Sequence, residues 1–130
     1  MNIKQAIEKR ILEKIEPDEK LVTKEFSESD YDIESSERAF EDEDFKWCIV
    51  KCYYSMFHSA RAVLFKLGFK ERRHFAINVV LEDLNNKGKL ETVYINDFRA
   101  AVSAREDADY HYSYSKESAQ YLLDIRRIQQ

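Results

Sequence analysis

One arginine and one histidine in the C-terminal third of the chain have types and a spacing suited to phosphate chemistry. They stand in the stretch "REDADYH", which begins with Arg105 and ends with His111. A guanidinium is a planar fork that matches a phosphate group, and an imidazole exchanges protons near neutral pH. Together the two side chains could hold a phosphodiester and move a proton at it.

Arg105 stands where an apolar residue is expected. It continues a helical stripe that consists of Tyr94, Phe98, Ala101 and Val102. A charge on that inward face needs a partner. One explanation is a salt bridge to an acid of a facing helix, and the acids considered are Glu41, Asp42 and Glu43. The other explanation is an anion-binding site.

His111 does not lie beside Arg105 if both belong to one unbroken helix. Six residues at 100° each leave the two side chains about 120° apart around the axis. The helix must therefore end between them, or the partner must come from a second copy of the chain. Asp107 and Asp109 disfavour helix interiors, so a helix end near residue 106 is expected. The alternative for His111 is an ordinary surface or hydrogen-bonded histidine without a catalytic role.

Three further groups of residues merit attention. Lys70, Arg72, Arg73 and His74 form the most basic stretch, which is either a solvated helix start or a contact for RNA or an acidic partner. His58 is expected to be a hydrogen-bonded core or interface residue. Cys48 and Cys52 lie on a nearly all-apolar helix, which favours core packing, so we expect no metal site.

Composition limits the class of protein. A chain of 130 residues with 44% hydrophobic residues is expected to be one domain, residues 1–130, with an N-terminal helix in 1–16 and a core in 17–130. A net charge of −4 argues against non-specific binding of nucleic acid but leaves room for a basic cleft. Two glycines are too few for a phosphate-binding glycine loop, and no cofactor is expected.

The same features predict a soluble, cytoplasmic protein. Residues 1–20 contain no apolar segment of the kind that forms a signal peptide. The most apolar segment, residues 45–69, carries four cations, which excludes an ordinary membrane span. Two cysteines do not make a disulfide framework.

Apolar residues recur at helical spacing through most of the chain, and no run alternates in the way of a strand. The predicted helices cover residues 3–15, 17–41, 43–68, 72–86, 91–106 and a last segment after Ser115. Pro17 is expected at the first position of the second helix, and Gly68 just past the end of the third. In the last helix the buried stripe is expected to be Ala119, Leu122 and either Ile125 or Arg126. The expected architecture is an all-α antiparallel bundle of five to six helices.

The stretch "KWCIVKCYYSMFHSARAVLFKLGFKERRHFAI" resembles the central segment of HEPN domains, and "ADY" ahead of the last helix resembles their C-terminal part. The core "YYSMFHSARAVL" looks like that of the small stand-alone prokaryotic members. The resemblance covers residues 17–128. It implies a HEPN-like helical bundle that forms a homodimer.

Many HEPN proteins are metal-independent ribonucleases with an Arg, a polar residue and a His in this spacing. The resemblance thus implies a toxin-type endoribonuclease with Arg105 and His111 as catalytic residues in a dimer cleft. RNA contacts are expected at Glu106, Arg72, Arg73, His74 and Tyr112. Glu106 departs from the Asn, Asp or His common at the polar position, and Ser113 stands where some members carry a tyrosine modified by their partner enzyme.

Two alternatives to catalysis remain. HEPN proteins are commonly paired with a minimal nucleotidyltransferase, so the resemblance also fits a non-catalytic module that binds this partner or a nucleotide. The acidic balance of the chain and Glu106 favour that hypothesis. A purely structural oligomerisation bundle is the third hypothesis.

Overall fold

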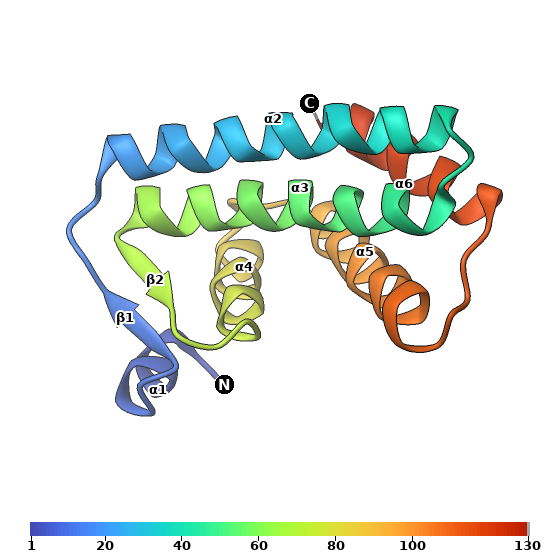
Figure 1. Ribbon diagram of the computed structural model, residues 1–130. Coiled ribbons are helices and arrows are strands. Elements are labelled where there is room, and N and C mark those ends of the chain that lie inside the picture. Colours follow the sequence, from blue (N-terminus) through green and yellow to red (C-terminus); the bar gives the residue numbers. More distant parts are fainter. Residues whose placement is uncertain (130) are drawn as a thin grey trace.

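The computed structural model describes the backbone of residues 1–129 and the side chains of residues 1–125. The described part forms a helical bundle with a small two-stranded sheet at one end (Figure 1). The elements are α1 (Ile3–Glu8), β1 (Leu12–Lys14), α2 (Glu19–Glu41), α3 (Phe45–Leu67), β2 (Phe69–Glu71), α4 (Ala76–Asn86), α5 (Thr92–Tyr110) and α6 (Lys116–Gln129). The predicted all-α bundle of helices is confirmed. Within residues 1–129, no helix has the length and apolar character needed to cross a membrane.

The long helices α2 and α3 form the frame of the molecule and run side by side in opposite directions (Figure 1). Small residues at their contact bring the backbones close. The hydroxyl of Ser29 donates to the carbonyl of Ser55 at 2.8 Å, and the hydroxyl of Ser55 donates back to the carbonyl of Ser29 at 2.8 Å. This reciprocal pair fixes how one helix lies along the other.

The core is built around α3, as expected for a helix with apolar residues on nearly all of its sides. Its buried residues face α2, α4, α5 and α6 on different sides of the helix. Ile49 and Leu64, for example, are fully buried. In α6, Ala119, Leu122 and Ile125 are buried as predicted, whereas the side chain of Arg126 lies outside the described residues. Ser115 caps α6 as expected, because its hydroxyl accepts the N–H of Ser118 at 3.1 Å.

The prediction of one helix over residues 3–15 and of no strand was wrong. Helix α1 begins with a capping box at Asn2 and ends at Glu8. Residues 12–14 then pair antiparallel with residues 69–71, with Leu12 opposite Glu71. The spacing of apolar residues could not reveal this pairing, because β2, the partner of β1, lies more than 50 residues further along the chain, directly after α3.

Three predicted helix ends also differ from the structure. Helix α2 begins at Glu19 and not at Pro17, and Asp18 caps it, because its side chain accepts the N–H of Lys20. Helix α4 begins at Ala76, after a turn in which the N–H of Ala76 donates to the carbonyl of Arg73. Helix α5 continues past residue 106 to Tyr110. These ends depend on capping and pairing contacts that spacing alone does not reveal.

Gly68 ends α3 in the left-handed conformation, with φ of 85°, as its predicted place just past the helix requires. A Cβ on this residue would lie 2.9 Å from the carbonyl oxygen of Ile15. We expect Gly68→Ala to lower the free energy of unfolding by about 2 kcal/mol, from backbone strain and this collision. Urea unfolding measures the change.

Gly88→Ala is the matched control for Gly68→Ala. Gly88 also has a left-handed φ, of 72°, but a Cβ there would meet no atom within 4 Å. Its substitution therefore adds only backbone strain, and a loss of about 1 kcal/mol is expected. Equal losses at the two glycines would contradict a role for the collision with Ile15.

Candidate functional site

Arg105 projects from α5 onto a group of tyrosine rings. Its guanidinium carbon lies 5.3 Å from the ring centre of Tyr53, 5.8 Å from that of Tyr54 and 5.5 Å from that of Tyr110. The side chain is 22% exposed, so it reaches the surface from a partly buried position. Aromatic faces attract the cation and hold it in one place.

The predicted salt bridge of Arg105 exists, but its predicted partner on a facing helix was wrong. The Nε atom of Arg105 donates to Asp109 Oδ2 at 3.0 Å, one turn along the same helix. This contact also explains why α5 continues through residues 107–109, because it offsets their weak preference for a helix. Among the described residues, the two terminal nitrogens of Arg105 have no hydrogen-bond partner, so this edge of the fork remains available to an anion.

Electrostatics keep Arg105 charged. Burial alone would lower its pKa, but the three surrounding tyrosines and Asp109 outweigh that effect and raise the pKa above its ordinary value. The pKa of Tyr53 is raised chiefly by burial, and the positive charge of Arg105 opposes that rise. The position therefore presents a permanent cation on an aromatic surface.

His111 is exposed and forms the C-terminal cap of α5. Its backbone N–H still donates to the carbonyl of Asp107, at 3.1 Å, so the chain follows the helix up to this residue. The expected helix end near residue 106 was wrong, because α5 continues to Tyr110 and His111 follows it directly. With helical geometry maintained, the two side chains leave the axis about 120° apart and diverge within one chain.

Glu106 follows Arg105 and Tyr112 follows His111, and both side chains are exposed. Tyr112 has a left-handed backbone, with φ of 52°, at a position where glycine is usual. It is 79% exposed, so the strained backbone is not compensated by burial of its ring. The turn is closed by the N–H of Ser113, which donates to the carbonyl of Asp107 at 2.9 Å.

Arg72, Arg73 and His74 lie in the turn between β2 and α4. Arg72 forms an ion pair with Glu13 of β1, whereas Arg73 and His74 are exposed. A row of aromatic rings on α3 connects this turn with Arg105. The ring of His74 lies 5.2 Å from that of Phe57, which in turn lies 6.1 Å from Tyr53 and 6.4 Å from Tyr54.

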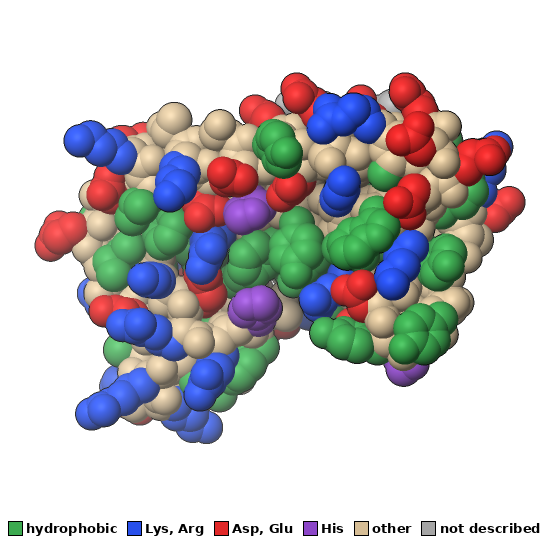
Figure 2. All heavy atoms as spheres, in the orientation of Figure 1, with side chains coloured by type: hydrophobic (Ala, Val, Ile, Leu, Met, Phe, Trp, Pro, Cys, Tyr) green, Lys and Arg blue, Asp and Glu red, His purple; other side chains and the backbone are tan. Residues whose placement is uncertain are grey.

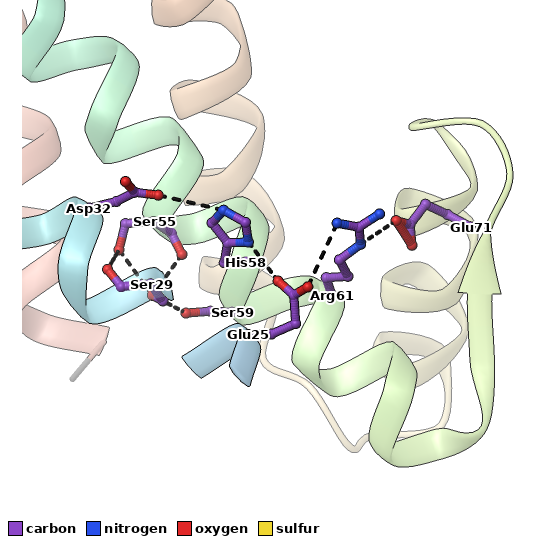
Figure 3. Close-up of polar contacts among 8 residues, drawn as sticks. All are labelled: Glu25, Ser29, Asp32, Ser55, His58, Ser59, Arg61 and Glu71. Carbon is purple, nitrogen blue, oxygen red and sulfur yellow. Dashed lines mark hydrogen bonds and ion pairs between the residues drawn. The ribbon is translucent and has the colours of Figure 1, made fainter. Parts of the chain in front are cut away.

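A series of polar contacts between acidic and basic side chains, which we call the chain of charges, links α2, α3 and β2 beside these rings (Figure 3). His58 lies between two carboxylates of α2, with Nδ1 2.5 Å from Glu25 Oε2 and Nε2 3.5 Å from Asp32 Oδ2. Arg61 continues the chain, with Nη1 3.7 Å from Glu25 Oε1 and Nε 2.5 Å from Glu71 Oε1. The prediction that His58 is hydrogen-bonded is confirmed.

The carboxylate partners in this chain of charges were not found from the sequence. Glu25 and Asp32 look like ordinary members of an acidic helix, although they lie on one face of α2, opposite the same histidine. Glu71 is the most unusual member, because its side chain is only 3% exposed. Its Oε2 atom is buried and has no hydrogen-bond partner among the described residues. These contacts join α2, α3 and β2, since each of the three carboxylates faces His58, Arg61 or both.

Burial raises the pKa of Asp32 above its value of 3.8, and Glu28 raises it further, while His58 and Lys51 act in the opposite direction. The folded state therefore binds more protons than the unfolded state between pH 3.8 and the raised pKa. Stability contributed by this group consequently falls as pH rises through that window. We expect Asp32→Asn to increase the free energy of unfolding at pH 7, and the gain to shrink as pH falls toward 3.8.

Urea unfolding at pH 7 and pH 4 tests this expectation. Glu34→Gln, an equal change of charge at an exposed position of α2, is the control and should leave stability nearly unchanged at both pH values. A loss of stability in Asp32→Asn at pH 7 would mean that the contact with His58 outweighs the cost of burial.

The two cysteines of α3 are buried, and neither forms a disulfide within the described residues. The pKa of Cys48 is raised by its hydrogen bond with Cys52 and by burial, which disfavours the thiolate that a metal requires. Among the described residues, no group of three or more His, Cys, Asp or Glu side chains is arranged to hold a metal ion.

A cavity of about 630 Å³ opens between α2, α3, α4 and α5. Its lining is mostly apolar and consists of Phe26, Ser29, Asp30, Met56, Ser59, Ala60, Val63, Leu81, Leu90, Tyr94 and Phe98. None of these side chains is cationic, and Asp30 would repel a phosphate. The cavity therefore does not suit the nucleotide considered from the sequence.

Comparison of the sequence with known proteins identifies a family of helical domains that agrees with the observed fold. A model of the HEPN domain matches residues 23–128, which is most of the chain. A protein of Methanocaldococcus jannaschii with the name "Putative toxin MJ0142" is 26% identical over 108 residues, which cover 81% of this chain and 71% of that protein. On the extent of the family match, the chain belongs to the HEPN domain family.

Proposed function

We propose that the protein is a toxin-type, metal-independent endoribonuclease whose active centre combines Arg105 and His111 from two copies of the chain. The proposal is supported mainly by the surroundings of Arg105 and by the availability of its terminal nitrogens. This cation is held on three tyrosine rings while its terminal nitrogens have no partner among the described residues. The toxin name of the archaeal relative is consistent with such an activity.

The need for two copies follows from helix geometry. Because α5 continues to Tyr110, Arg105 and His111 of one chain diverge. In a dimer with two-fold symmetry, each Arg105 can meet the His111 of the other chain, since the same patch is present on both sides of the interface.

The chemistry needs only these side chains. His111 takes the proton of a ribose 2′-hydroxyl, and the 2′-oxygen attacks the adjacent phosphorus. Arg105 holds the phosphate and stabilises the charge that develops on it. The bond from phosphorus to the 5′-oxygen breaks, the leaving oxygen receives a proton, and the products are a 2′,3′-cyclic phosphate and a 5′-hydroxyl. Tyr112 offers an exposed ring on which a base can stack, and Glu106 lies at the edge of the same centre.

A toxin needs a partner that restrains it. We infer, from the family resemblance, that a minimal nucleotidyltransferase fulfils this role and that the protein acts in the cytoplasm. Co-purification of the two proteins would test the pairing, but it does not bear on cleavage.

Cleavage itself is tested with purified protein, RNA and excess chelator. The parent chain should cut the RNA and leave a cyclic phosphate end, whereas Arg105→Ala and His111→Ala should not. If the parent leaves RNA intact at every protein concentration, the ribonuclease proposal fails for this chain.

The second candidate function is a non-catalytic binding module. Its support is that Arg105 already holds the carboxylate of Asp109 and that Glu106 adds negative charge nearby. This alternative predicts that the parent chain binds its partner or RNA and leaves the RNA uncut under the conditions of the same assay.

A further inference from the structure

The N-terminal segment builds a separate surface at one end of the bundle, which we call the basic lobe: α1, β1, β2 and the turn over residues 72–75 (Figure 1). The lobe is well anchored. Ala6 is fully buried, Leu12 is 1% exposed, and β1 pairs with β2. Because the HEPN match begins at residue 23, α1 and β1 precede the part of the chain that the family model covers.

Charge is distributed unevenly between the lobe and the rest of the chain. Residues 1–16 and 69–75 contain seven Lys and Arg against four Asp and Glu, a net charge of +3. With −4 for the whole chain, the remainder carries −7. Figure 2 shows the cationic side chains gathered over this corner of the molecule, below the level of α2. The acidic balance of the chain therefore conceals a local cationic surface.

Most of these cations are unpaired and exposed. Arg72 forms an ion pair with Glu13. The other six have no ion pair among the described residues, and they are Lys4, Lys9, Arg10, Lys14, Lys70 and Arg73. Arg10 stands in a turn with a left-handed backbone, φ of 61°, where Asn or Gly is more usual. Cations that neutralise no acid of their own chain are suited to an external polyanion.

Aromatic rings accompany the cations. Phe75 is 51% exposed, and the ring of exposed His74 packs on Phe57. Beneath the surface the row of rings continues from Phe57 through Tyr53 and Tyr54 to Arg105, and of these three rings only Tyr54 is partly exposed. Single-stranded RNA presents both phosphates and unstacked bases, so it matches cations that alternate with rings. An acidic protein would match the cations, but it offers no unstacked bases to stack on the rings.

We propose that the basic lobe binds the phosphate backbone of single-stranded RNA, with His74 and Phe75 as stacking surfaces for its bases. The proposal rests on the proposed function in that it assigns the lobe to the substrate cut at Arg105. It adds a binding surface of which α1 and β1 lie outside the family-matched segment, whereas β2 and the turn over residues 72–75 lie within it. A strand held there would pass over α3 toward the catalytic centre, where Tyr54 is partly exposed and Phe57 and Tyr53 are buried.

The test measures binding apart from cleavage. The probe is a fluorescent 20-nucleotide 2′-O-methyl RNA, which lacks the hydroxyl that the cleavage reaction requires. Binding to the parent chain is followed by anisotropy at several salt concentrations. The variant Lys70→Glu/Arg73→Glu should bind at least 10-fold more weakly, and its log–log salt slope should be shallower by about 0.7 for each phosphate that the variant no longer neutralises.

Two controls isolate the lobe. Lys20→Glu/Lys24→Glu makes the same change of charge on exposed positions of α2 and should leave affinity within about 2-fold of the parent, apart from long-range screening effects. Phe75→Ala should weaken binding several-fold without changing the salt slope, because stacking releases no counterions. Thermal unfolding of each variant checks that the fold is intact.

Three results would overturn the proposal. The Lys70/Arg73 variant could bind the probe as tightly as the parent, both double variants could weaken binding equally, or poly-glutamate of equal charge could bind as tightly as the RNA. The last result would assign the lobe to an acidic protein. If the parent binds RNA through the lobe but does not cleave it, only the ribonuclease proposal fails. If the Lys70/Arg73 variant cleaves RNA with an unchanged KM, only the proposed role of the lobe fails.

Discussion

Substitution of Arg105 by alanine is expected to lower RNA cleavage by about 10²–10³-fold, the usual effect of removing a group that stabilises transition-state charge. The side chain carries a permanent charge and is oriented by Tyr53, Tyr54 and Tyr110. A loss in kcat with little change in KM is expected, because the charge on the phosphate increases as the reaction proceeds.

Two variants make this result specific. Arg105→Lys keeps the charge but not the planar fork, so activity should fall between the parent and Arg105→Ala. Arg99→Ala removes an exposed arginine of the same helix, whose partner is Glu82, and should retain the parent activity. If Arg99→Ala lost as much activity as Arg105→Ala, the effect would reflect the total charge of α5 and not a site.

The second large effect concerns stability. Arg61→Ala is expected to lower the free energy of unfolding by about 2–3 kcal/mol, because it leaves the carboxylate of Glu71 buried without its cation. The side chain of Glu71 is 3% exposed, and its Oε2 atom already lacks a partner among the described residues. We place the loss below the usual cost of a broken buried pair because Arg61 itself is 30% exposed.

Chemical denaturation of the single and double variants measures this effect. Glu71→Gln introduced into Arg61→Ala should recover part of the loss, since a neutral amide is less costly to bury than a charge. Lys66→Ala, at an exposed position of the same helix, is the control and should change stability by less than about 0.5 kcal/mol. An Arg61→Ala variant as stable as the parent would show that Glu71 becomes protonated or hydrated at little cost.

The helices could be predicted from the sequence wherever apolar spacing is long and regular, as in α2 and α3. What the spacing could not reveal were contacts between distant segments. Residues 12–14 have the composition of a helix end, and only the edge offered by residues 69–71 makes them a strand. The end of α5 was misplaced because Asp109 was counted as a helix breaker, although its contact with Arg105 supports the helix.

The candidate site likewise contains residues that the sequence predicted and contacts that it could not predict. The motif identified Arg105 and His111, and the apolar stripe correctly suggested that the arginine is partly buried. The tyrosine surroundings of Arg105 could not be predicted, because Tyr53 and Tyr54 belong to a helix more than 40 residues earlier. The carboxylates around His58 escaped notice for the same reason, since an acidic helix gives no sign of which acids face inward.

The most direct measurement of the central claim is subunit complementation. Arg105→Ala and His111→Ala, each inactive alone, are mixed in equal amounts and allowed to exchange subunits, and RNA cleavage is measured with excess chelator. If each centre takes its arginine from one chain and its histidine from the other, half of the dimers are mixed and each keeps one of two centres, so about one quarter of the parent activity should return. A mixture that exchanges subunits but remains inactive, beside an active parent, would contradict a centre shared between two copies.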